Sequence, residues 1–364
     1  MQDCVTVIEL FAGIGAFSKA LTNLGVKHKV LDAVEIDKYA VQSFNAVHGT
    51  NFEPQDITKW DKTFDEPVDF IMHGSPCQDF SVAGRQAGGD KGSGTRSSLM
   101  YETLRIVEKL KPKCVIWENV KNLLSPKHRH NFDAYLQAMA DLGYHSNYQV
   151  LNARDFGVPQ NRERVFTVSI RKDLEDEFMA FGFPEKKPLT VKLKDLLEDS
   201  VDEKYYVSDR MLDYFMGVNQ RPSKFPRKER FMSNIFRKNQ DIANSLTTNQ
   251  GNRPTDNFVL EPVCVASRGR GENNEQHLEP RRDGVTNTIT TVQKDNYIYV
   301  PNRLRKLTPK ECWRLMGFED SDIEKAENAG VSKTQLYHQA GNSIVVNCIQ
   351  AIMFNVIGAM YGKE

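Results

Sequence analysis

Two kinds of hydrophobic pattern alternate over residues 1–170. Short apolar runs rich in β-branched residues predict buried strands, and stretches with apolar positions three and four residues apart predict amphipathic helices. The predicted strands are 4–10, 30–35, 68–73, 114–118, 146–151 and 165–170, and the predicted helices between them include 17–24, 40–48 and 99–110. Strands that alternate with helices form parallel sheets covered on both faces. The pattern therefore predicts an α/β domain with a doubly wound, mostly parallel sheet.

The pattern changes after Pro184, where the sequence becomes Lys-rich and then Pro-, Asn- and Thr-rich as far as Pro301. A weak duplication lies inside this segment. Residues 244–248 (NSLTT) recur as 287–291 (NTITT), and residues 257–262 recur as 296–301. The repeats predict two strand–loop–strand units with polar tips, and hence a second, smaller, β-rich domain.

Helical periodicity returns from Leu304 onward. Thr308 followed by Pro309 is typical of a capped helix start, and Ser343 is expected to cap a long apolar helix over 344–360. The wide apolar face of that helix predicts packing against the first domain. These changes of pattern predict three parts: a first domain over 1–185, a β-rich domain over 186–302, and a C-terminal helical segment over 303–364 that returns to the first domain.

The composition is that of a folded protein, with 364 residues of which 40% are hydrophobic and 26% charged. The six cysteines contain no CxxC pair, which predicts neither a disulfide framework nor a zinc or other metal site. The start of the chain lacks the basic and apolar regions of a signal peptide, and no apolar run approaches the ~20 residues of a membrane span. We therefore expect a cytoplasmic protein without a membrane segment.

The formal net charge is zero, but the charge is unevenly distributed. Residues 219–310 contain 17 Lys and Arg against 9 Asp and Glu, so the rest of the chain is acidic. The basic segment therefore coincides with the predicted β-rich domain.

Gly13 and Gly15 follow the first predicted strand and open a helix, and Glu35 ends the next strand. Glycines at such a turn let the backbone approach a ligand, and an acid about 20 residues further on can bind both ribose hydroxyls. Ser18 stands where a dinucleotide-binding motif has its third glycine. A single nucleoside therefore fits better than a dinucleotide, and a plain tight turn is the structural alternative.

Cys77 lies just after the third predicted strand, and Glu118 ends the fourth. Neighbouring parallel strands end at the same edge of a sheet, so the thiol and the carboxyl are expected close together. A thiolate is a nucleophile for an electron-poor ring, and a buried carboxyl has a raised pKa and can donate a proton to a ring nitrogen. The alternatives are a buried structural thiol and a salt-bridged acid at a strand end.

Basic residues accompany these two positions. Arg162 and Arg164 alternate at the start of the last predicted strand, so both guanidinium groups are expected on one face. They are candidates for the positive charge that favours a thiolate, with a solvated strand edge as the alternative. Residues 82–98 contain five glycines with Arg85, Lys91 and Arg96 among them. We interpret this stretch as a mobile lid that closes on a polyanion, with a disordered loop as the alternative.

Six motifs, taken in order, resemble those of the cytosine-5 DNA methyltransferase family of bacterial or phage type. They are 11–15 (FAGIG), 74–78 (GSPCQ), 118–120 (ENV), 160–164 (QNRER), 305–312 (RKLTPKEC) and 341–343 (GNS). The resemblance covers nearly the whole chain outside 186–300. It implies a Rossmann-like methyltransferase fold, an S-adenosylmethionine cofactor, and a target-recognition domain in the place of the duplicated basic segment.

The resemblance also implies four catalytic residues. Cys77 would add to C6 of cytosine so that C5 can attack a methyl sulfonium, and release of the thiol by β-elimination would complete the cycle. Glu118 would protonate or hydrogen-bond N3 and bind the exocyclic amine, while Arg164 would hold O2. Arg162 would position the backbone or Glu118. No metal is implied.

The implied cofactor pocket involves both ends of the chain. Phe11 would lie against the adenine, Gly13 and Gly15 beside the amino-acid part, and Glu35 on the ribose. The family often has a stacking tryptophan where this chain has Ile36, so a lower cofactor affinity is expected. The other implied positions are Asp56 and Ile57 at the adenine edge, Pro76 beside the nucleophile, and Asn342 and Ser343 in the C-terminal wall.

The expected partner is double-stranded DNA, whose target nucleotide must rotate out of the helix at a cost of a few kcal/mol, because C5 and C6 lie inside the duplex. Polar residues of the repeat tips are predicted to read base edges in the major groove: Asn249, Gln250, Arg253, Gln293 and Lys294. Phosphate contacts are predicted for Arg227, Lys228, Arg268 and Arg270, and further DNA contacts for the lid residues Arg85, Gln86 and Arg96.

An RNA methyltransferase with the same catalytic residues is the nearest alternative, and the long basic insert favours DNA. A nicotinamide-dependent oxidoreductase explains only the glycines and Glu35. A non-catalytic DNA-binding regulator leaves Cys77, Glu118 and Arg164 without a role. The sequence leaves open the recognition site, and whether the protein acts beside a restriction endonuclease, in a phage or alone. We expect a monomer, because an enzyme that flips bases can work on one strand at a time.

Overall fold

The computed structural model describes residues 4–76, 96–206, 208, 210, 242–246, 248, 250, 257–270, 275–281 and 297–362, with the backbone alone for 96–97, 194, 258–270, 275–281 and 297–304. The chain forms two compact units. The first comprises Met1–Leu196, Asp241–Thr248 and Pro309–Glu364, and the second comprises Leu197–Gln240 and Asn249–Thr308.

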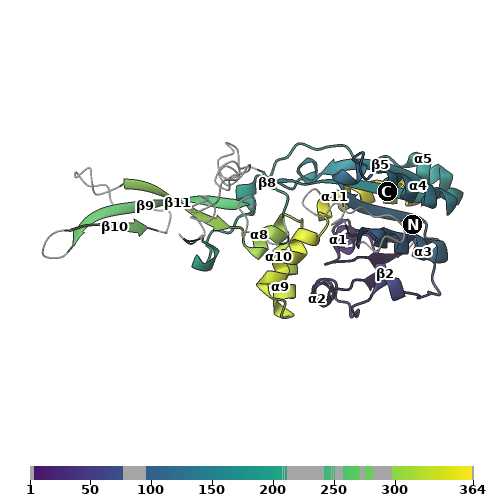
Figure 1. The fold of residues 1–364 in the computed structure, drawn as a ribbon, viewed down its shortest axis with the longest axis horizontal. Coiled ribbons are helices and arrows are strands. Elements are labelled where there is room, and N and C mark those ends of the chain that lie inside the picture. Colours follow the sequence, from purple (N-terminus) through teal and green to yellow (C-terminus); the bar gives the residue numbers. More distant parts are fainter. Residues whose placement is uncertain are drawn as a thin grey trace. The chain divides into compact units, whose positions relative to one another are not determined.

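The first unit is built on a six-stranded sheet with the order β2-β1-β3-β4-β7-β5 (Figure 1). Its strands are β1 (Val5–Leu10), β2 (His28–Val34), β3 (Phe70–His73), β4 (Cys114–Val120), β5 (Tyr144–Asn152) and β7 (Glu163–Arg171). The first four strands of this order pair in parallel, whereas β7 runs antiparallel to both β4 and β5. All six predicted strands are present, and the doubly wound, mostly parallel sheet is confirmed.

The helices of the first unit are α1 (Ala16–Asn23), α2 (Lys38–His48), α3 (Met100–Leu110), α4 (Arg129–Asp141), α5 (Glu175–Ala180), α8 (Pro309–Arg314), α9 (Asp320–Asn328), α10 (Lys333–Asn342) and α11 (Val346–Tyr361). Helices lie on both faces of the sheet, and α8, α9 and α10 pack against other helices. Short 3-10 turns are η1 (Ile57–Lys59), η2 (Arg96–Leu99), η3 (Lys121–Leu124), η4 (Ala153–Phe156), η5 (Lys172–Leu174) and η6 (Leu193–Leu196).

Side chains alternate along each strand, so each face of the sheet has its own core. On one face, Ile71 and Trp117 pack with Ile106 of α3 and Phe132 of α4. On the other face, Phe70 meets Phe17 of α1 with ring centroids 6.3 Å apart, and α11 packs against α1. The C-terminal helix thus returns to the first unit, far along the chain from the helix that it contacts.

The start of α11 differs from the prediction. The helix begins at Val346 with Val345 as its N-cap, and Ser343 does not cap it. Ser343 instead ends α10, where its backbone N–H donates to the Gln339 carbonyl at 2.9 Å, and its hydroxyl donates to the Ile344 carbonyl. The expected cap was therefore wrong, because the serine still belongs to the end of the preceding helix. The predicted start of α8 at Pro309, directly after Thr308, is confirmed.

The second unit contains a three-stranded antiparallel sheet in which β9 (Phe258–Arg270) lies between β10 (Glu275–Arg281) and β11 (Tyr297–Lys306). A register shift separates Tyr299 from Arg303 in β11. The turn η7 (Glu203–Tyr205) precedes a single bridge between Tyr206 and Arg305. The unit is β-rich in its described part.

Among the described residues, no single helix is long and apolar enough to cross a membrane. The pair α10 and α11 satisfies length and composition only when taken together, and it is bent by 43°.

Candidate active site

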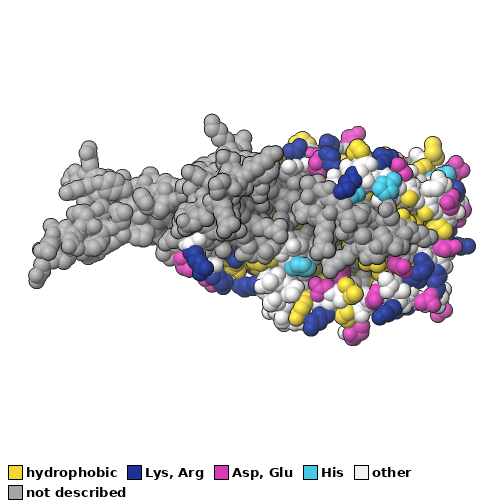
Figure 2. Space-filling view, viewed as in Figure 1, with side chains coloured by type: hydrophobic (Ala, Val, Ile, Leu, Met, Phe, Trp, Pro, Cys, Tyr) yellow, Lys and Arg dark blue, Asp and Glu magenta, His cyan; other side chains and the backbone are white. Residues whose placement is uncertain are grey.

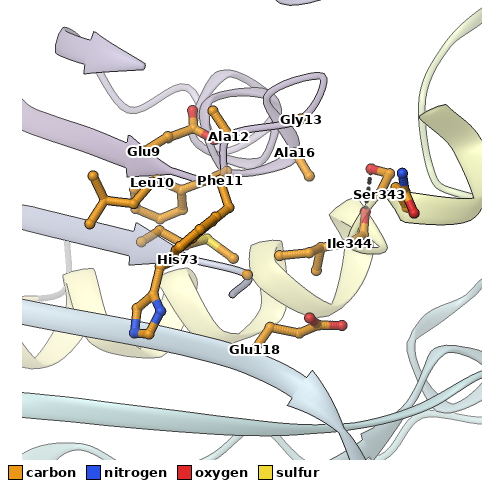
Figure 3. A pocket seen from close by; sticks show the side chains of 14 residues that line it. Glu9, Leu10, Phe11, Ala12, Gly13, Ala16, His73, Glu118, Ser343 and Ile344 are labelled. Atoms are coloured by element: carbon orange, nitrogen blue, oxygen red, sulfur yellow. Dashed lines mark hydrogen bonds between the residues drawn. The ribbon is translucent and has the colours of Figure 1, made fainter. Parts of the chain in front are cut away.

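A pocket lies at the carboxyl ends of β1, β3 and β4, where the loop before α1 faces the turn between α10 and α11 (Figure 3). Open α/β sheets bind their ligands at this edge. The lining residues are Glu9, Leu10, Phe11, Ala12, Gly13, Ala16, Phe17, Met72, His73, Gly74, Glu118, Asn342, Ser343 and Ile344. Phe11, Gly13, Glu118, Asn342 and Ser343 are thus brought together from three separate predicted motifs.

The loop after β1 has an unusual backbone. Phe11 has a φ of 54°, which is rare for a residue with a side chain, and Gly13 and Gly15 have φ values of 55° and 79°. A Cβ atom at Gly15 would lie 2.2 Å from Nε2 of His48, so no larger residue fits. A Cβ atom at Gly13 would have no neighbour within 4 Å, because this glycine faces the pocket. Gly15 is therefore required by protein packing, and Gly13 leaves room for a ligand.

Glu35 holds this loop in place. Its Oε2 accepts from the Gly13 N–H at 3.0 Å, and its Oε1 accepts from the N–H groups of Ile36 and Asp37 at 2.9 Å each. Burial raises the pKa of this carboxyl above its usual value, and the three N–H donors oppose that rise. The exposed Ile36 side chain next to it retains 71% of its accessible surface.

Other predicted cofactor positions lie outside the residues that line the pocket. Asp56 caps η1 through its side chain, which accepts from the Thr58 N–H at 3.0 Å, and Ile57 is buried. Gly15 is buried behind the loop, and Pro76 is half-buried at the end of the described part of its segment. None of these four residues lines the pocket, although Gly15 and Pro76 are close in sequence to residues that do.

Glu118 and Arg164 form an ion pair beside the pocket. The Arg164 Nε lies 3.0 Å from the Glu118 Oε1, and the Glu118 side chain is only 10% exposed. The two residues reach each other because β7 runs antiparallel to β4, with Val120 paired to Arg164. Burial raises the pKa of Glu118 above its usual value, while the charges of Arg164 and Arg162 oppose that rise. The site therefore favours a carboxyl that keeps its proton to a higher pH than an exposed glutamate.

Arg162 faces the backbone around the pocket. Its Nη2 donates to the carbonyls of Ser343 at 2.7 Å and Gly341 at 3.2 Å, while its Nη1 lies 3.4 Å from the Leu246 carbonyl and 3.3 Å from the Ser245 hydroxyl. This buried guanidinium thus joins the C-terminal wall of the pocket to residues 245–246, which supports a positioning role over contact with a substrate.

Gln160 is a positioning residue. It belongs to the motif over 160–164, but the sequence did not predict a role for it. It is fully buried and pairs with two segments, accepting from the Leu246 N–H at 3.0 Å and donating to the Leu315 carbonyl at 2.7 Å. The feature of the sequence that could have indicated this role is its position two residues before Arg162. The segment held in this way includes β8 (Ala243–Asn244), which pairs in parallel with β6 (Gln160–Asn161).

Glu9 was also missed. Its carboxyl group lies in the mostly apolar β1 and accepts from the N–H of Ser18 at 3.1 Å and from the Ser18 hydroxyl. Burial raises its pKa to about 7, against these hydrogen bonds. Because Gly15 provides no side-chain cap for α1, Glu9 caps the start of this helix from the neighbouring strand. The feature of the sequence that could have indicated this role is an acidic residue within a mostly apolar strand.

Several predicted site residues cannot be placed. Cys77, Arg85, Gln86, Arg227, Lys228, Asn249, Arg253, Gln293 and Lys294 lie outside the described residues, and Arg96, Arg268 and Arg270 are described by their backbone alone. Gln250 is described: it is buried and its amide nitrogen donates to the Asn257 carbonyl at 3.1 Å. Reading a base edge through this amide nitrogen would require that contact to break. Within the described residues, no cluster of His, Cys, Asp or Glu has the arrangement of a metal site.

Comparison with known proteins decides the family. The model described as C-5 cytosine-specific DNA methylase matches residues 5–358. The chain belongs to this family. The methylase is 32% identical to the orphan methyltransferase M.SPRI of Bacillus phage SPR over 98% of each chain. It is 31% identical to the type II methyltransferase M.HhaI of Haemophilus parahaemolyticus over 96% of this chain and 93% of the relative.

The fold agrees with this assignment. The crystal structure of the S. pombe Dnmt2 methyltransferase aligns with a TM-score of 0.66 and 18% identity, over 98% of this chain and 99% of that one. At this identity the likeness shows the fold alone. The family predicted from the six motifs, the Rossmann-like fold and the enzyme class of DNA cytosine-C5 methyltransferases are thereby confirmed.

Proposed function

We propose that this methylase transfers a methyl group from S-adenosylmethionine to C5 of a cytosine that is flipped out of a specific site in duplex DNA. One observation carries the proposal: the buried Glu118, paired with Arg164, faces the same pocket as the glycine loop after β1. A carboxyl whose pKa is raised by burial and a guanidinium 3.0 Å away are suited to the ring nitrogen and the carbonyl oxygen of a pyrimidine.

The residues present fit the proposed cofactor. Gly13 leaves open space where a side chain would stand, and Asn342 and Ser343 form the facing wall. Phe11 and the exposed Ile36 offer apolar surface to an adenine, and Glu35 directly follows β2. When bound there, S-adenosylmethionine supplies an electrophilic methyl group on a sulfonium.

Cys77 is proposed as the nucleophile on the basis of the family motif. Its thiolate adds to C6 of the cytosine, which makes C5 electron-rich, and Glu118 stabilises the ring through a hydrogen bond or proton transfer at N3. Arg164 binds O2, where negative charge develops. After the methyl group is on C5, loss of the C5 proton and departure of the sulfur from C6 restore the aromatic ring.

DNA binding is proposed to involve the basic segment 219–310, which forms much of the second unit. On the face of the molecule in Figure 2, the described surface has Lys and Arg interspersed with Asp and Glu. The uneven distribution of charge in the sequence therefore makes the basic segment the better candidate for phosphate contacts. The base-reading role of the repeat tips and the closing role of residues 82–98 stay predictions, and for Gln250 that role requires its contact with Asn257 to break.

The test is transfer of a labelled methyl group from S-adenosylmethionine to duplex DNA and, in parallel, to RNA. We expect label in duplex DNA, and we expect Cys77→Ser to lose turnover while it keeps DNA binding. Label found only in RNA would refute the proposed substrate, and a Cys77→Ser variant with substantial turnover would refute the nucleophile. Mapping the methylated cytosines of a plasmid from expressing cells would identify the recognition sequence.

A further inference from the structure

Ser75, which follows β3, is hydrogen-bonded to Trp117 and Asn119 of β4. The Ser75 hydroxyl accepts from the Trp117 Nε1 at 2.9 Å, and the Asn119 Nδ2 lies 3.4 Å from that hydroxyl and 3.3 Å from the Ser75 carbonyl oxygen. A Cβ atom at Gly74 would stand 3.8 Å from the Glu118 Oε2. Ser75 thus contacts the residues directly before and directly after Glu118.

The Trp117 side chain, which donates to Ser75, is held rigidly by its neighbours. The Trp117 indole is 1% exposed and is stacked on His73, with ring centroids 5.7 Å apart and an angle of 4° between the planes. Phe132 and Tyr135 contact the same indole at 5.8 Å and 4.1 Å between centroids. Such packing fixes the direction of the indole N–H, so Ser75, which is 3% exposed, has one well-defined position on it.

The contact between Ser75 and β4 bears on the distance between the Cys77 thiol and the Glu118 carboxyl group. Side chains alternate along β4, so Trp117 and Asn119 bind Ser75 on one face of the strand while Glu118 projects to the pocket on the other. Cys77 follows Ser75 by two residues, and two residues of extended chain span at most about 7 Å. Fixing Ser75 on β4 therefore limits how far the backbone of Cys77 can move from the strand that carries Glu118.

We propose that Ser75 is a positioning residue whose hydroxyl, held by Trp117 and Asn119, sets the placement of the nucleophile relative to the acid. This inference rests on the proposed function, and it adds to it a residue outside the reacting groups. The pair Ser75–Trp117 works as a clamp: one partner lies on the segment that leads to the thiol, and the other lies directly before the acid.

The test compares Ser75→Ala with a matched control. Ser169 is equally buried in the same sheet, at 1% exposed, and its hydroxyl pairs with that of Ser146 at 2.8 Å, on strands β7 and β5. We expect Ser75→Ala to lower the single-turnover rate of methyl transfer roughly 10- to 100-fold, as small misplacements of reacting groups do. Dissociation constants for cofactor and DNA should stay within about twofold, because both binding surfaces are unchanged. Ser169→Ala should lower the melting temperature while the rate stays near that of the wild type.

Trp117→Phe removes the indole N–H donor. The variant therefore distinguishes the effect of the Ser75–Trp117 hydrogen bond from a general loss of packing. In this background, adding Ser75→Ala should change the rate less than twofold, since the shorter hydrogen bond to the hydroxyl is already absent and only the 3.4 Å contact with Asn119 remains. Equal rates for Ser75→Ala and Ser169→Ala, or full additivity of the Ser75 and Trp117 substitutions, would overturn the inference. A wild-type protein that transfers no methyl group would instead overturn the proposed function.

Discussion

Glu118 is the residue whose environment bears most directly on the proposed methyl-transfer chemistry. Its burial raises the pKa, and the neighbouring guanidinium groups of Arg164 and Arg162 oppose that effect. Ion pairing of a buried carboxylate ordinarily keeps it charged, so two opposing influences act on one group. A site that holds a proton on Glu118 suits a hydrogen bond to a ring nitrogen, which an ionised carboxylate cannot donate.

Glu118→Gln tests this role. The amide keeps the size of the side chain but cannot transfer a proton, so we expect kcat to fall roughly 10²- to 10⁴-fold with DNA binding retained. Because the pKa of Glu118 is raised, its protonated form persists to higher pH than that of an exposed glutamate. The wild-type rate should decline as pH rises through that pKa, and the decline should be absent in the variant. An identical alkaline decline in both proteins would assign it to another group.

Glu9 gives a prediction for stability. Its pKa is about 7 in the folded protein against 4.5 for an ordinary glutamate, so the folded state binds this proton more tightly than the unfolded state. The resulting stabilisation is complete below pH 4.5 and is lost as pH rises through 7, on the order of 3 kcal/mol in all. Glu9→Gln should reduce the difference between the unfolding free energies at pH 5 and pH 8 by that order, as measured in urea. An unchanged difference would show that Glu9 does not titrate in this range.

At the scale of elements, the turn between β1 and α1 contains two glycines, Gly13 and Gly15, that are needed for different reasons. Gly15→Ala would place a Cβ atom at a positive φ and 2.2 Å from His48, so we expect a loss of about 2–5 kcal/mol in unfolding free energy. Gly13→Ala meets no protein atom within 4 Å, and we expect a loss of about 1–2 kcal/mol. Cofactor binding should nevertheless weaken at least tenfold, because the methyl group enters the pocket. Calorimetric binding and urea unfolding of both variants measure this; a Gly13→Ala protein with unchanged cofactor affinity would contradict the account.

The strands and their order in the chain could be predicted from the sequence, since a buried parallel sheet needs continuous apolar runs such as 5–10 and 114–117. The antiparallel placement of β7 could not, because local periodicity carries no information on strand direction. That direction is what brings Arg164 opposite Val120 and next to Glu118. The cap at Ser343 was wrong for a related reason: the serine suits a helix start, but the preceding helix extends to Asn342.

At the scale of the whole molecule, the first unit is assembled from three stretches of sequence that are far apart. Gln160 and Arg162 join them, because they bind residues 245–246, the Leu315 carbonyl and the 341–343 turn. On composition, 241–248 was grouped with the basic segment, since nothing local shows that its backbone pairs with a strand 83 residues earlier. The motifs named candidate site residues, and the tertiary contacts show which of them line the pocket.

Gln160→Ala tests this joining role. It leaves the buried Leu246 N–H and Leu315 carbonyl without their partner, which should lower the unfolding free energy by about 2–4 kcal/mol. Hydrogen exchange at the Leu246 amide should accelerate more than exchange in β1, because the 243–246 segment is released first. Equal acceleration at both places would indicate general destabilisation instead of release of this segment.

The central claim is that the sulfur of Cys77 bonds transiently to C6 of the target cytosine. The most direct measurement incubates the protein and S-adenosylmethionine with duplex DNA that carries 5-fluorocytosine at the mapped target, since fluorine at C5 blocks the elimination that releases the sulfur. We predict a complex that survives denaturation, with the nucleotide attached at Cys77 in the peptide mass spectrum. Absence of that adduct, or attachment at another residue, would contradict the account.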